Sequence, residues 1–207
     1  MIQMRFLLIH YCTYFSNVTI SENLHIARYG CLGQIHNPCQ VFDGLREKNI
    51  VSWNSMVACY FQNNQPNKAR NLFDQMPERS TVSWNGLISG YVKNRMVKEA
   101  REVFDKMPHR NVISWTAMIR GYIQEGYVQN SHVDVARKLF EVMPHKNKVS
   151  WTAMLNGYTQ CGRMNEAMEL FNAMPYKSVV SCNAMILGFS QNGDVDKARN
   201  IFDQTIE

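Results

Sequence analysis

The sequence lacks the features of a membrane or disulfide-stabilised protein. The N-terminal apolar run Phe6–Ile9 is far shorter than the roughly 20 residues that span a bilayer, and no other run approaches that length. The six cysteines include no C-x-x-C pair, and none lies at zinc-ligand spacing from a histidine. The sequence therefore predicts no membrane span, metal site or disulfide framework, and a reducing compartment fits it best.

The sequence also lacks a large excess of charge of either sign. Lys and Arg number 22 against 17 Asp and Glu, which gives a formal net charge of +5. This mild excess permits a polyanionic partner but does not require one. Hydrophobic residues make up 45% of the chain, which is ordinary for a folded protein and too high for intrinsic disorder.

The first 18 residues admit two interpretations. They contain one Lys or Arg, Arg5, and no acidic residue. Acid-poor segments of this kind resemble organelle transit peptides, although transit peptides usually contain more Arg. The alternative is that residues 1–18 are an irregular beginning of the first repeat.

A repeat of about 31 residues is the strongest signal in the chain. Ser-Trp begins at residues 52, 83, 114 and 150 and then becomes Ser181-Cys182, with spacings of 31, 31, 36 and 31. Two further landmarks keep the same rhythm: Met-Pro begins at 76, 107, 143 and 174, and Phe recurs at 42, 73, 104, 140, 171 and 202. Fixed periods in this range are typical of solenoid proteins.

The spacing of apolar residues within each unit predicts two helices. In the unit 81–111, one apolar helical face is formed by Trp84, Leu87, Ile88 and Tyr91, and a second by Val97, Ala100, Val103, Phe104 and Met107. Pro108 ends the second helix, because proline lacks an N–H and clashes with the preceding turn. The predicted fold class is therefore all-α, a solenoid of tandem helix-turn-helix repeats whose Trp, Tyr, Phe and Met stripes form the core. We expect each tryptophan of the Ser-Trp series to be mostly buried, at the interface of its own helix pair with the preceding one.

A small residue precedes the aromatic residue near the end of each first helix. The series is Cys59, Gly90, Gly121, Gly157 and Gly188. Glycine inside a helix costs about 1 kcal/mol relative to alanine, so we expect two helices to approach closely there, with the alanines of the second helices at the same contact.

Six units are assigned: 19–49, 50–80, 81–111, 112–147, 148–178 and a partial unit 179–207. The first is degenerate, because Glu22 stands where Trp is expected and Pro38 stands in the alanine series. The fourth has five extra residues, and within it Gly121–Gln124 is echoed by Gly126–Gln129. We interpret this unit as a junction between halves of two repeats. The extra residues are expected to lengthen its first helix or bulge its turn, with Phe140 still packed like Phe104.

Three segments carry a resemblance to a known family: Val-Ser-Trp-Asn-Gly-Leu-Ile-Ser-Gly-Tyr at 82–91, Ala-Arg-Glu-Val-Phe-Asp-Lys-Met-Pro at 100–108 and Val-Ser-Trp-Thr-Ala-Met-Leu-Asn-Gly-Tyr at 149–158. Over residues 19–207 the chain resembles the pentatricopeptide repeat family, in its short 31-residue repeat type. The resemblance implies a right-handed superhelix that binds single-stranded organellar RNA in a mitochondrion, or alternatively in a chloroplast. It implies roles in RNA editing, splicing or processing, with editing or processing proteins as further partners.

Recognition of one base per repeat requires a polar side chain at a fixed place in each unit, beside an apolar wall. The residue after Trp, or at its register, fits the first requirement: Asn23, Asn54, Asn85, Thr116, Thr152 and Asn183. We call these residues the first readers. A second series, the companion readers, ends the units: Asn49, Ser80, Asn111, Asn147 and Ser178. A β-branched residue stands three places before each first reader, and the resemblance implies that this series sandwiches the bases: Ile20, Val51, Val82, Ile113, Val149 and Val180. The alternative is helix capping, which explains small polar residues but not the companion series.

The family's two-residue correspondence implies a base for each pair. Asn23 with Asn49 implies a pyrimidine, Asn54 with Ser80 cytosine, and Asn85 with Asn111 a pyrimidine, with cytosine favoured. Thr116 with Asn147 implies adenine, and Thr152 with Ser178 a purine, with adenine favoured. Asn183 implies a pyrimidine. The implied tract is pyrimidine-C-pyrimidine-A-A-pyrimidine, 5′ to 3′.

Lys93 stands where the family often carries a phosphate-binding lysine, although it also fits a solvated turn residue. The equivalent positions hold Gln62, Gln124 or Gln129, Gln160 and Gln191. Editing members of the family end in a deaminase-like domain with an H-x-E motif, and no histidine here precedes Glu by two residues. We therefore predict no catalytic residue, no cofactor and no small-molecule substrate. A protein-interaction scaffold and a truncated, non-functional fragment are the alternative interpretations.

The junction interpretation predicts the effect of a deletion. Removal of residues 123–127 restores the 31-residue spacing, so we expect the melting temperature to rise. Thermal unfolding followed by circular dichroism measures this, and an unchanged or lower melting temperature would count against a junction.

Overall fold

The computed structural model describes residues 36–126 and 131–206. Ile20 and Asn23, together with the segment 1–18, lie outside the described residues. All regular secondary structure of the described residues is helical, which confirms the all-α prediction. The helices are α2 (His36–Gly44), α3 (Ile50–Gln62), α4 (Pro66–Asp74), α5 (Thr81–Lys93), α6 (Val97–Lys106), α7 (Val112–Gly126), α8 (Ser131–Val142), α9 (Lys148–Gln160), α10 (Met164–Ala173), α11 (Val179–Gln191) and α12 (Val195–Ile206).

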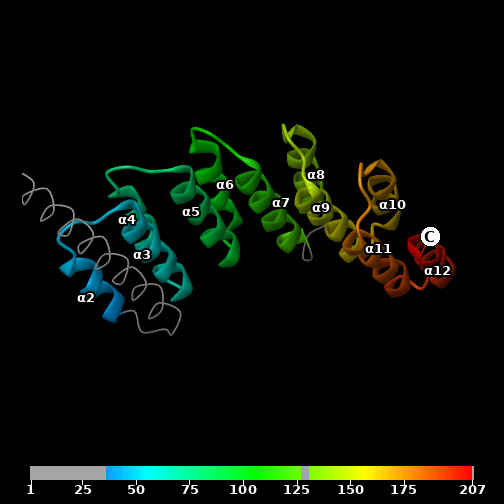
Figure 1. The fold of residues 1–207 in the computed structure, drawn as a ribbon, viewed down its shortest axis with the longest axis horizontal. Helices are drawn as coiled ribbons and strands as arrows, with labels where there is room; N and C mark the ends of the chain where they lie inside the picture. Colours follow the sequence, from blue (N-terminus) through cyan, green and yellow to red (C-terminus); the bar gives the residue numbers. More distant parts are fainter. Residues whose placement is uncertain (1–35, 127–130, 207) are drawn as a thin grey trace, which may run out of the picture. The chain divides into compact units, whose positions relative to one another are not determined.

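The chain forms two compact units, which meet between Asn94 and Arg95 in the sequence. Unit 1 contains α2 to α5 and unit 2 contains α6 to α12 (Figure 1). In both, the two helices of a repeat alternate. We call α3, α5, α7, α9 and α11 the first helices, and α2, α4, α6, α8, α10 and α12 the second helices.

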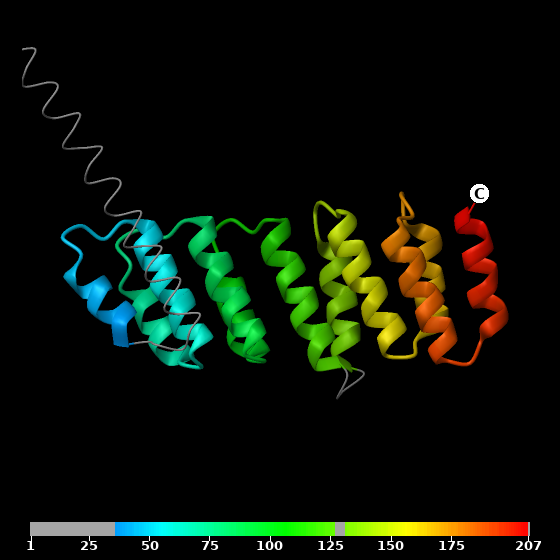
Figure 2. The ribbon, with the colours of Figure 1, turned by 60° about the horizontal axis from the view of Figure 1, so that its bottom comes forward.

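The first helices of each unit pack directly on one another. In unit 2, α9 contacts both α7 and α11, while α8 and α10 each pack between their own first helix and the next one (Figure 2). Unit 1 repeats the arrangement with α3, α4 and α5. Second helices make no contact with one another within the described ranges. Each unit therefore presents a continuous layer of first helices, built from nearest-neighbour contacts.

The serine of each Ser-Trp pair completes a helix cap. In α9, Asn147 precedes the helix and its Oδ1 accepts a hydrogen bond from the Ser150 amide at 2.9 Å. The Ser150 hydroxyl in turn accepts from the Asn147 amide at 3.0 Å. The same reciprocal box starts α5 and α11. A cap of this kind contributes about 1 kcal/mol, and it explains why a serine, buried in every described repeat, comes before the tryptophan.

Each tryptophan meets the phenylalanine of the preceding second helix edge to face. The ring centroids lie 4.8–5.1 Å apart, with interplanar angles of 76–80°, in the pairs Phe42–Trp53, Phe73–Trp84, Phe104–Trp115 and Phe140–Trp151. The tryptophans are half-buried and the phenylalanines are buried. The prediction that each tryptophan lies at the interface with the preceding helix pair is confirmed.

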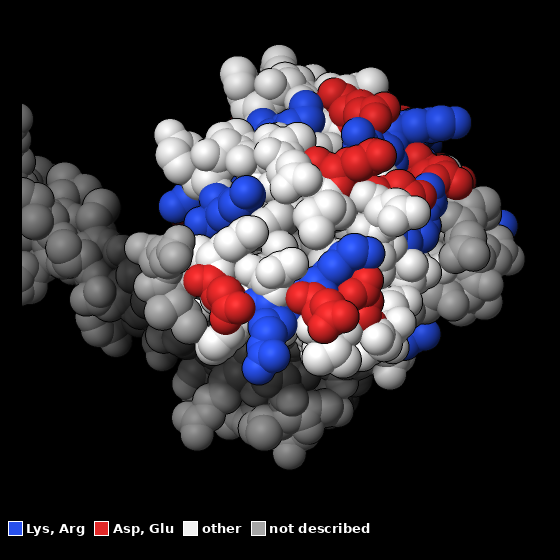
Figure 3. Space-filling view, turned by 90° about the vertical axis from the view of Figure 1, so that its right-hand side faces the viewer, with Lys and Arg blue, Asp and Glu red and all other residues white. Residues whose placement is uncertain are grey.

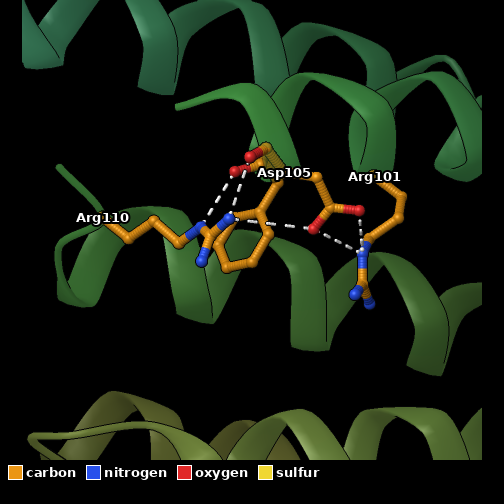
Figure 4. Close-up of polar contacts among 4 residues, drawn as sticks. Arg101, Asp105 and Arg110 are labelled. Carbon is orange, nitrogen blue, oxygen red and sulfur yellow. Dashed lines mark hydrogen bonds and ion pairs between the residues drawn. The ribbon is translucent and has the colours of Figure 1, made fainter. Parts of the chain in front are cut away.

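A basic residue covers each of these phenylalanines. Arg110, for example, lies 4.7 Å from the centroid of Phe104 and donates hydrogen bonds to the carbonyls of Phe104 and Asp105 at 2.9 and 3.0 Å. Figure 4 shows how Asp105 also faces Arg101, at 2.8 Å. Because the last carbonyls of a helix have no intrahelical partner, a cation placed here stabilises the helix end as well as the ring.

The recurrent glycines receive side chains from the preceding first helix. A Cβ at Gly90 would overlap the ring of Phe61, and a Cβ at Gly157 would lie 2.7 Å from Cγ1 of Ile123. The expectation of close approach is confirmed, but the partner expected from sequence is wrong. The alanines of the second helices do not fill these sites, because first helices pack directly on first helices.

The fourth repeat accommodates its extra residues partly in its first helix. Helix α7 has 15 residues, whereas α3, α5, α9 and α11 have 13 each. Residues 127–130 lie outside the described residues. Phe140 keeps the same edge-to-face contact as Phe104, so the predicted lengthening and the predicted packing are both confirmed.

Two glycines of α5 provide a matched test of the close approach. Gly86→Ala adds a Cβ that meets nothing within 4 Å, so we expect stability to rise by up to about 1 kcal/mol. Gly90→Ala forces Phe61 to move, and we expect a loss of about 1–3 kcal/mol. Urea unfolding of both variants measures the difference. Equal changes of the same sign would contradict the proposed packing.

Cys182 occupies the place of the missing tryptophan and offers a second test. Cys182 is buried. Lys177 Nζ lies 4.9 Å from the centroid of the Phe171 ring, as in the other repeats, but the residue at position 182 cannot meet that ring as a tryptophan does. Cys182→Trp should restore the edge contact and stabilise the chain by about 0.5–1.5 kcal/mol, measured by urea unfolding. Cys182→Ala is the control for loss of the thiol, and a tryptophan variant less stable than this control would argue against the contact.

Candidate nucleic-acid interface

A regular series of exposed apolar side chains marks the layer of first helices. Each described first helix carries a β-branched residue at its second position, between 53% and 67% exposed: Val51, Val82, Ile113, Val149 and Val180. These are the residues predicted to sandwich bases. Exposed apolar residues that recur at one position of every repeat are not explained by the core, and such surfaces usually bind something.

The predicted first readers lie one helical turn further along the same helices. Asn54 and Thr152 are half-buried, Asn85 and Thr116 are buried, and Asn183 is exposed. Residues three apart share one helical face, so each reader lies beside its β-branched neighbour. The Thr152 hydroxyl donates to the Lys148 carbonyl at 2.7 Å, which leaves its oxygen available to accept. The buried Thr116 hydroxyl oxygen has no hydrogen-bond partner among the described residues.

The predicted companion readers are the helix caps themselves. Asn49, Ser80, Asn147 and Ser178 each cap the following first helix, and Asn111 Oδ1 accepts from the Ser114 amide at 3.0 Å. From sequence we held that capping leaves this series unexplained, and that argument is wrong, because every described member is a cap. The cap of Asn147 uses only its Oδ1, so capping does not occupy its Nδ2 donors.

In unit 2, the four residues predicted to hold one base line a single cavity. Val149 and Thr152 come from α9, Ser178 caps α11 and Val180 follows from α11. The cavity has a volume of about 730 Å³ and is also lined by Arg120, Ile123, Gln124, Lys148, Ala153, Asn156 and Gln160. This volume lies in the range of small-ligand sites.

The other predicted pairs are located by the helices and units that carry their residues. Val51 and Asn54 lie on α3, while Ser80 and Val82 begin α5, which packs on α3 in unit 1. Asn85 belongs to unit 1 and Asn111 to unit 2. Lys93 is exposed at the end of α5, the place that Gln62, Gln160 and Gln191 occupy in their own first helices.

Several basic residues away from the cavity are paired with nearby acids. Arg137 pairs with Glu141 at 2.6 Å, and Arg163 with Glu166 at 2.7 Å. A backbone hydrogen bond and Arg163 lower the pKa of Glu166, so this carboxylate stays charged at neutral pH. Viewed from the C-terminal end, the described surface carries acidic and basic side chains next to one another (Figure 3).

The part of the chain that the structure describes contains no helix long and apolar enough to cross a membrane. Within the same residues, no three His, Cys, Asp or Glu side chains gather as metal ligands would.

Family models recognise most of the chain. The model for the PPR repeat matches residues 82–112, 113–130, 149–179 and 180–207, and the model for the PPR repeat family matches residues 48–81. The chain belongs to the pentatricopeptide repeat family. The matches stop at residue 130 and resume at 149, so the second half of the elongated repeat, like residues 1–47, falls outside them.

Pentatricopeptide repeat proteins of Arabidopsis thaliana are similar to parts of the chain. One, named as chloroplastic, is 44% identical over 54 residues, which are 26% of this chain and 7% of that protein. Another, named as mitochondrial, is 51% identical over 46 residues, 22% of this chain and 6% of that protein. The matched segments are thus a small part of much longer relatives.

The fold agrees with a solved member of the family. The pentatricopeptide repeat protein PPR10 from maize superimposes with a TM-score of 0.71 at 19% identity, over 90% of this chain and 28% of that one. PPR10 in complex with an 18-nucleotide psaJ RNA element gives a TM-score of 0.64 at 18% identity, over 89% and 29%. These likenesses confirm the helical repeat fold of this pentatricopeptide repeat chain.

Sequence reasoning missed three polar residues of the cavity: Arg120, Lys148 and Asn156. A signal for two of them was present, because Arg120 and Asn156 each follow a predicted reader by four residues. That spacing keeps them on the reader's helical face. No repeat-wide pattern marks them, since the corresponding residues differ between the repeats of this pentatricopeptide repeat chain.

Proposed function

We propose that this chain binds single-stranded RNA along its layer of first helices, with one base at each repeat. The observation that carries the proposal is the cavity in unit 2, where Val149, Thr152, Ser178 and Val180 converge. Two β-branched side chains from neighbouring helices supply apolar walls for the faces of a base. Two polar side chains supply partners for its edge. Single-stranded recognition requires this combination, because an unstacked base presents both its faces and its edges.

The proposed base preferences follow the pairs of readers. The pair Thr152 and Ser178 is assigned adenine, and the acceptor oxygen of Thr152 is suited to the exocyclic amine of that base. The pair Thr116 and Asn147 is also assigned adenine, and Asn54 with Ser80 is assigned cytosine. With pyrimidines at the remaining repeats, the proposed tract is pyrimidine-C-pyrimidine-A-A-pyrimidine.

The proposed setting is an organelle, where the bound transcript undergoes editing, splicing or processing. Relatives named as chloroplastic and as mitochondrial support an organellar location, and we propose the mitochondrion, with the chloroplast as the alternative. The RNA complex of the maize relative supports RNA as the partner. We propose that the chain itself is not an enzyme, and that editing or processing proteins supply the chemistry.

One substitution in the cavity tests the base assignment. Thr152→Asn converts the fifth pair to the same residues as Asn54 with Ser80. We therefore expect the preference at that nucleotide to move from adenine to cytosine, roughly ten- to a hundredfold for a pair worth about 1–3 kcal/mol. Binding to two short RNAs that differ only at this nucleotide measures the change.

Ser181→Ala is the matched control for that substitution. It removes the hydroxyl half of the cap that starts α11, in the next repeat, and Ser181 does not line the cavity. We expect lower stability and an unchanged base preference. If the Thr152→Asn variant and the unsubstituted chain bind both RNAs equally, the proposed assignment is wrong.

A further inference from the structure

The cavity in unit 2 carries two positive charges and no negative charge. Arg120 on α7 and Lys148 at the start of α9 line it together with Thr152 and Ser178, and its lining includes no Asp or Glu. Both cations are exposed, and neither has an ion pair with any described residue. They differ in this from Arg137 and the other paired arginines on the second helices. Uncompensated charge in a hollow attracts an anion.

The position of Arg120 separates it from the bases. It lies four residues after the reader Thr116 and four before Gln124 on the same face of α7. On α9, Asn156 lies in the same relation to Thr152 and Gln160. Arg120 is therefore about one helical turn beyond the reader Thr116 and two turns beyond the β-branched Ile113, the level at which we place the backbone of a bound nucleotide. Lys148 reaches the cavity from the adjacent helix, beside the cap Asn147.

We infer that Arg120 and Lys148 bind the phosphodiester between the nucleotide read by Thr116 with Asn147 and the nucleotide read by Thr152 with Ser178. This inference rests on the proposed function. The glutamines at Gln124, Gln160 and Gln191 bring no charge to the ends of their helices, so unit 2 draws its phosphate contact from residues nearer the readers. A guanidinium presents paired donors that match two phosphate oxygens, and an ammonium adds a point charge.

The dependence of RNA affinity on salt tests the inference. The probe is a short single-stranded RNA that contains CCCAAC, which fits the proposed tract. Each phosphate contact steepens the fall of log affinity with log salt by about 0.7 for single strands. Because both cations are assigned to one phosphodiester, the unsubstituted chain should lose about 2.6-fold more affinity between 50 and 200 mM salt than Arg120→Gln with Lys148→Gln, and part of that difference should appear in Arg120→Gln alone.

Three controls make the result specific. Lys138→Gln removes an exposed cation of α8 that does not line the cavity, and it should leave the salt dependence unchanged. Arg120→Lys keeps the charge and should retain the dependence. The Arg120→Gln variant should keep the base preference at the Thr152 nucleotide, since it removes no contact to a base.

A neutral linkage in the RNA locates the contact. A methylphosphonate between the two adenines of the probe should weaken binding to the unsubstituted chain and to Lys138→Gln. It should cause little further loss in Arg120→Gln with Lys148→Gln, because the contact is already gone.

The outcomes distinguish failure of the proposed function from failure of the phosphate contact alone. If the unsubstituted chain does not retain the probe at low salt, the proposed function fails and the inference fails with it. If it binds with base preference but Arg120→Gln leaves the salt dependence unchanged, only the inference is overturned. Lower affinity with an unchanged salt dependence would mean that Arg120 stacks on a base, which also overturns the phosphate contact.

Discussion

The edge-to-face contact between each tryptophan and the phenylalanine of the preceding second helix fixes the geometry on which the rest depends. A contact of this kind contributes about 0.5–1.5 kcal/mol beyond the area it buries. The basic residue on the ring, such as Arg110 on Phe104, adds a cation–π contact and satisfies the end of the helix. In the four repeats that carry the tryptophan, this group of side chains ties one repeat to the next; before α11, where Cys182 replaces the tryptophan, the basic cover of Phe171 by Lys177 remains. Contacts between neighbouring repeats set the interval between the first helices.

That interval determines what the layer of first helices presents. Side chains such as Phe61 and Ile123 enter the spaces left by Gly90 and Gly157, so the first helices lie in contact. The β-branched residues and caps of neighbouring repeats are therefore held at a repeated spacing within each unit. The cavity of unit 2 is one result, since its walls come from adjacent helices that could not both line it if larger residues kept them apart.

Periodic features of this structure could be predicted from sequence, and features that depend on pairing in space could not. The 31-residue landmarks predicted the helices, the end of α6 before Pro108 and the tryptophan interface. They did not predict that Gly157 faces Ile123, because both alanine and aliphatic partners satisfy the pattern. Arg120 was missed because nothing comparable recurs in other repeats. The capping role of Asn147 was misjudged, since its hydrogen bond to Ser150 is visible only in three dimensions.

The caps that start the first helices also limit how recognition can change. Asn147 and Ser178 hold a helix end with the same small side chains to which we assign a base edge. Only a few residue types, chiefly Asn, Asp, Ser and Thr, cap a helix well. A mutation outside this set would weaken the repeat as well as alter its ligand. Under the proposed function, a change of RNA target through this position is therefore restricted to the few residue types that cap a helix, whereas the proposed reader within the helix is not restricted in this way.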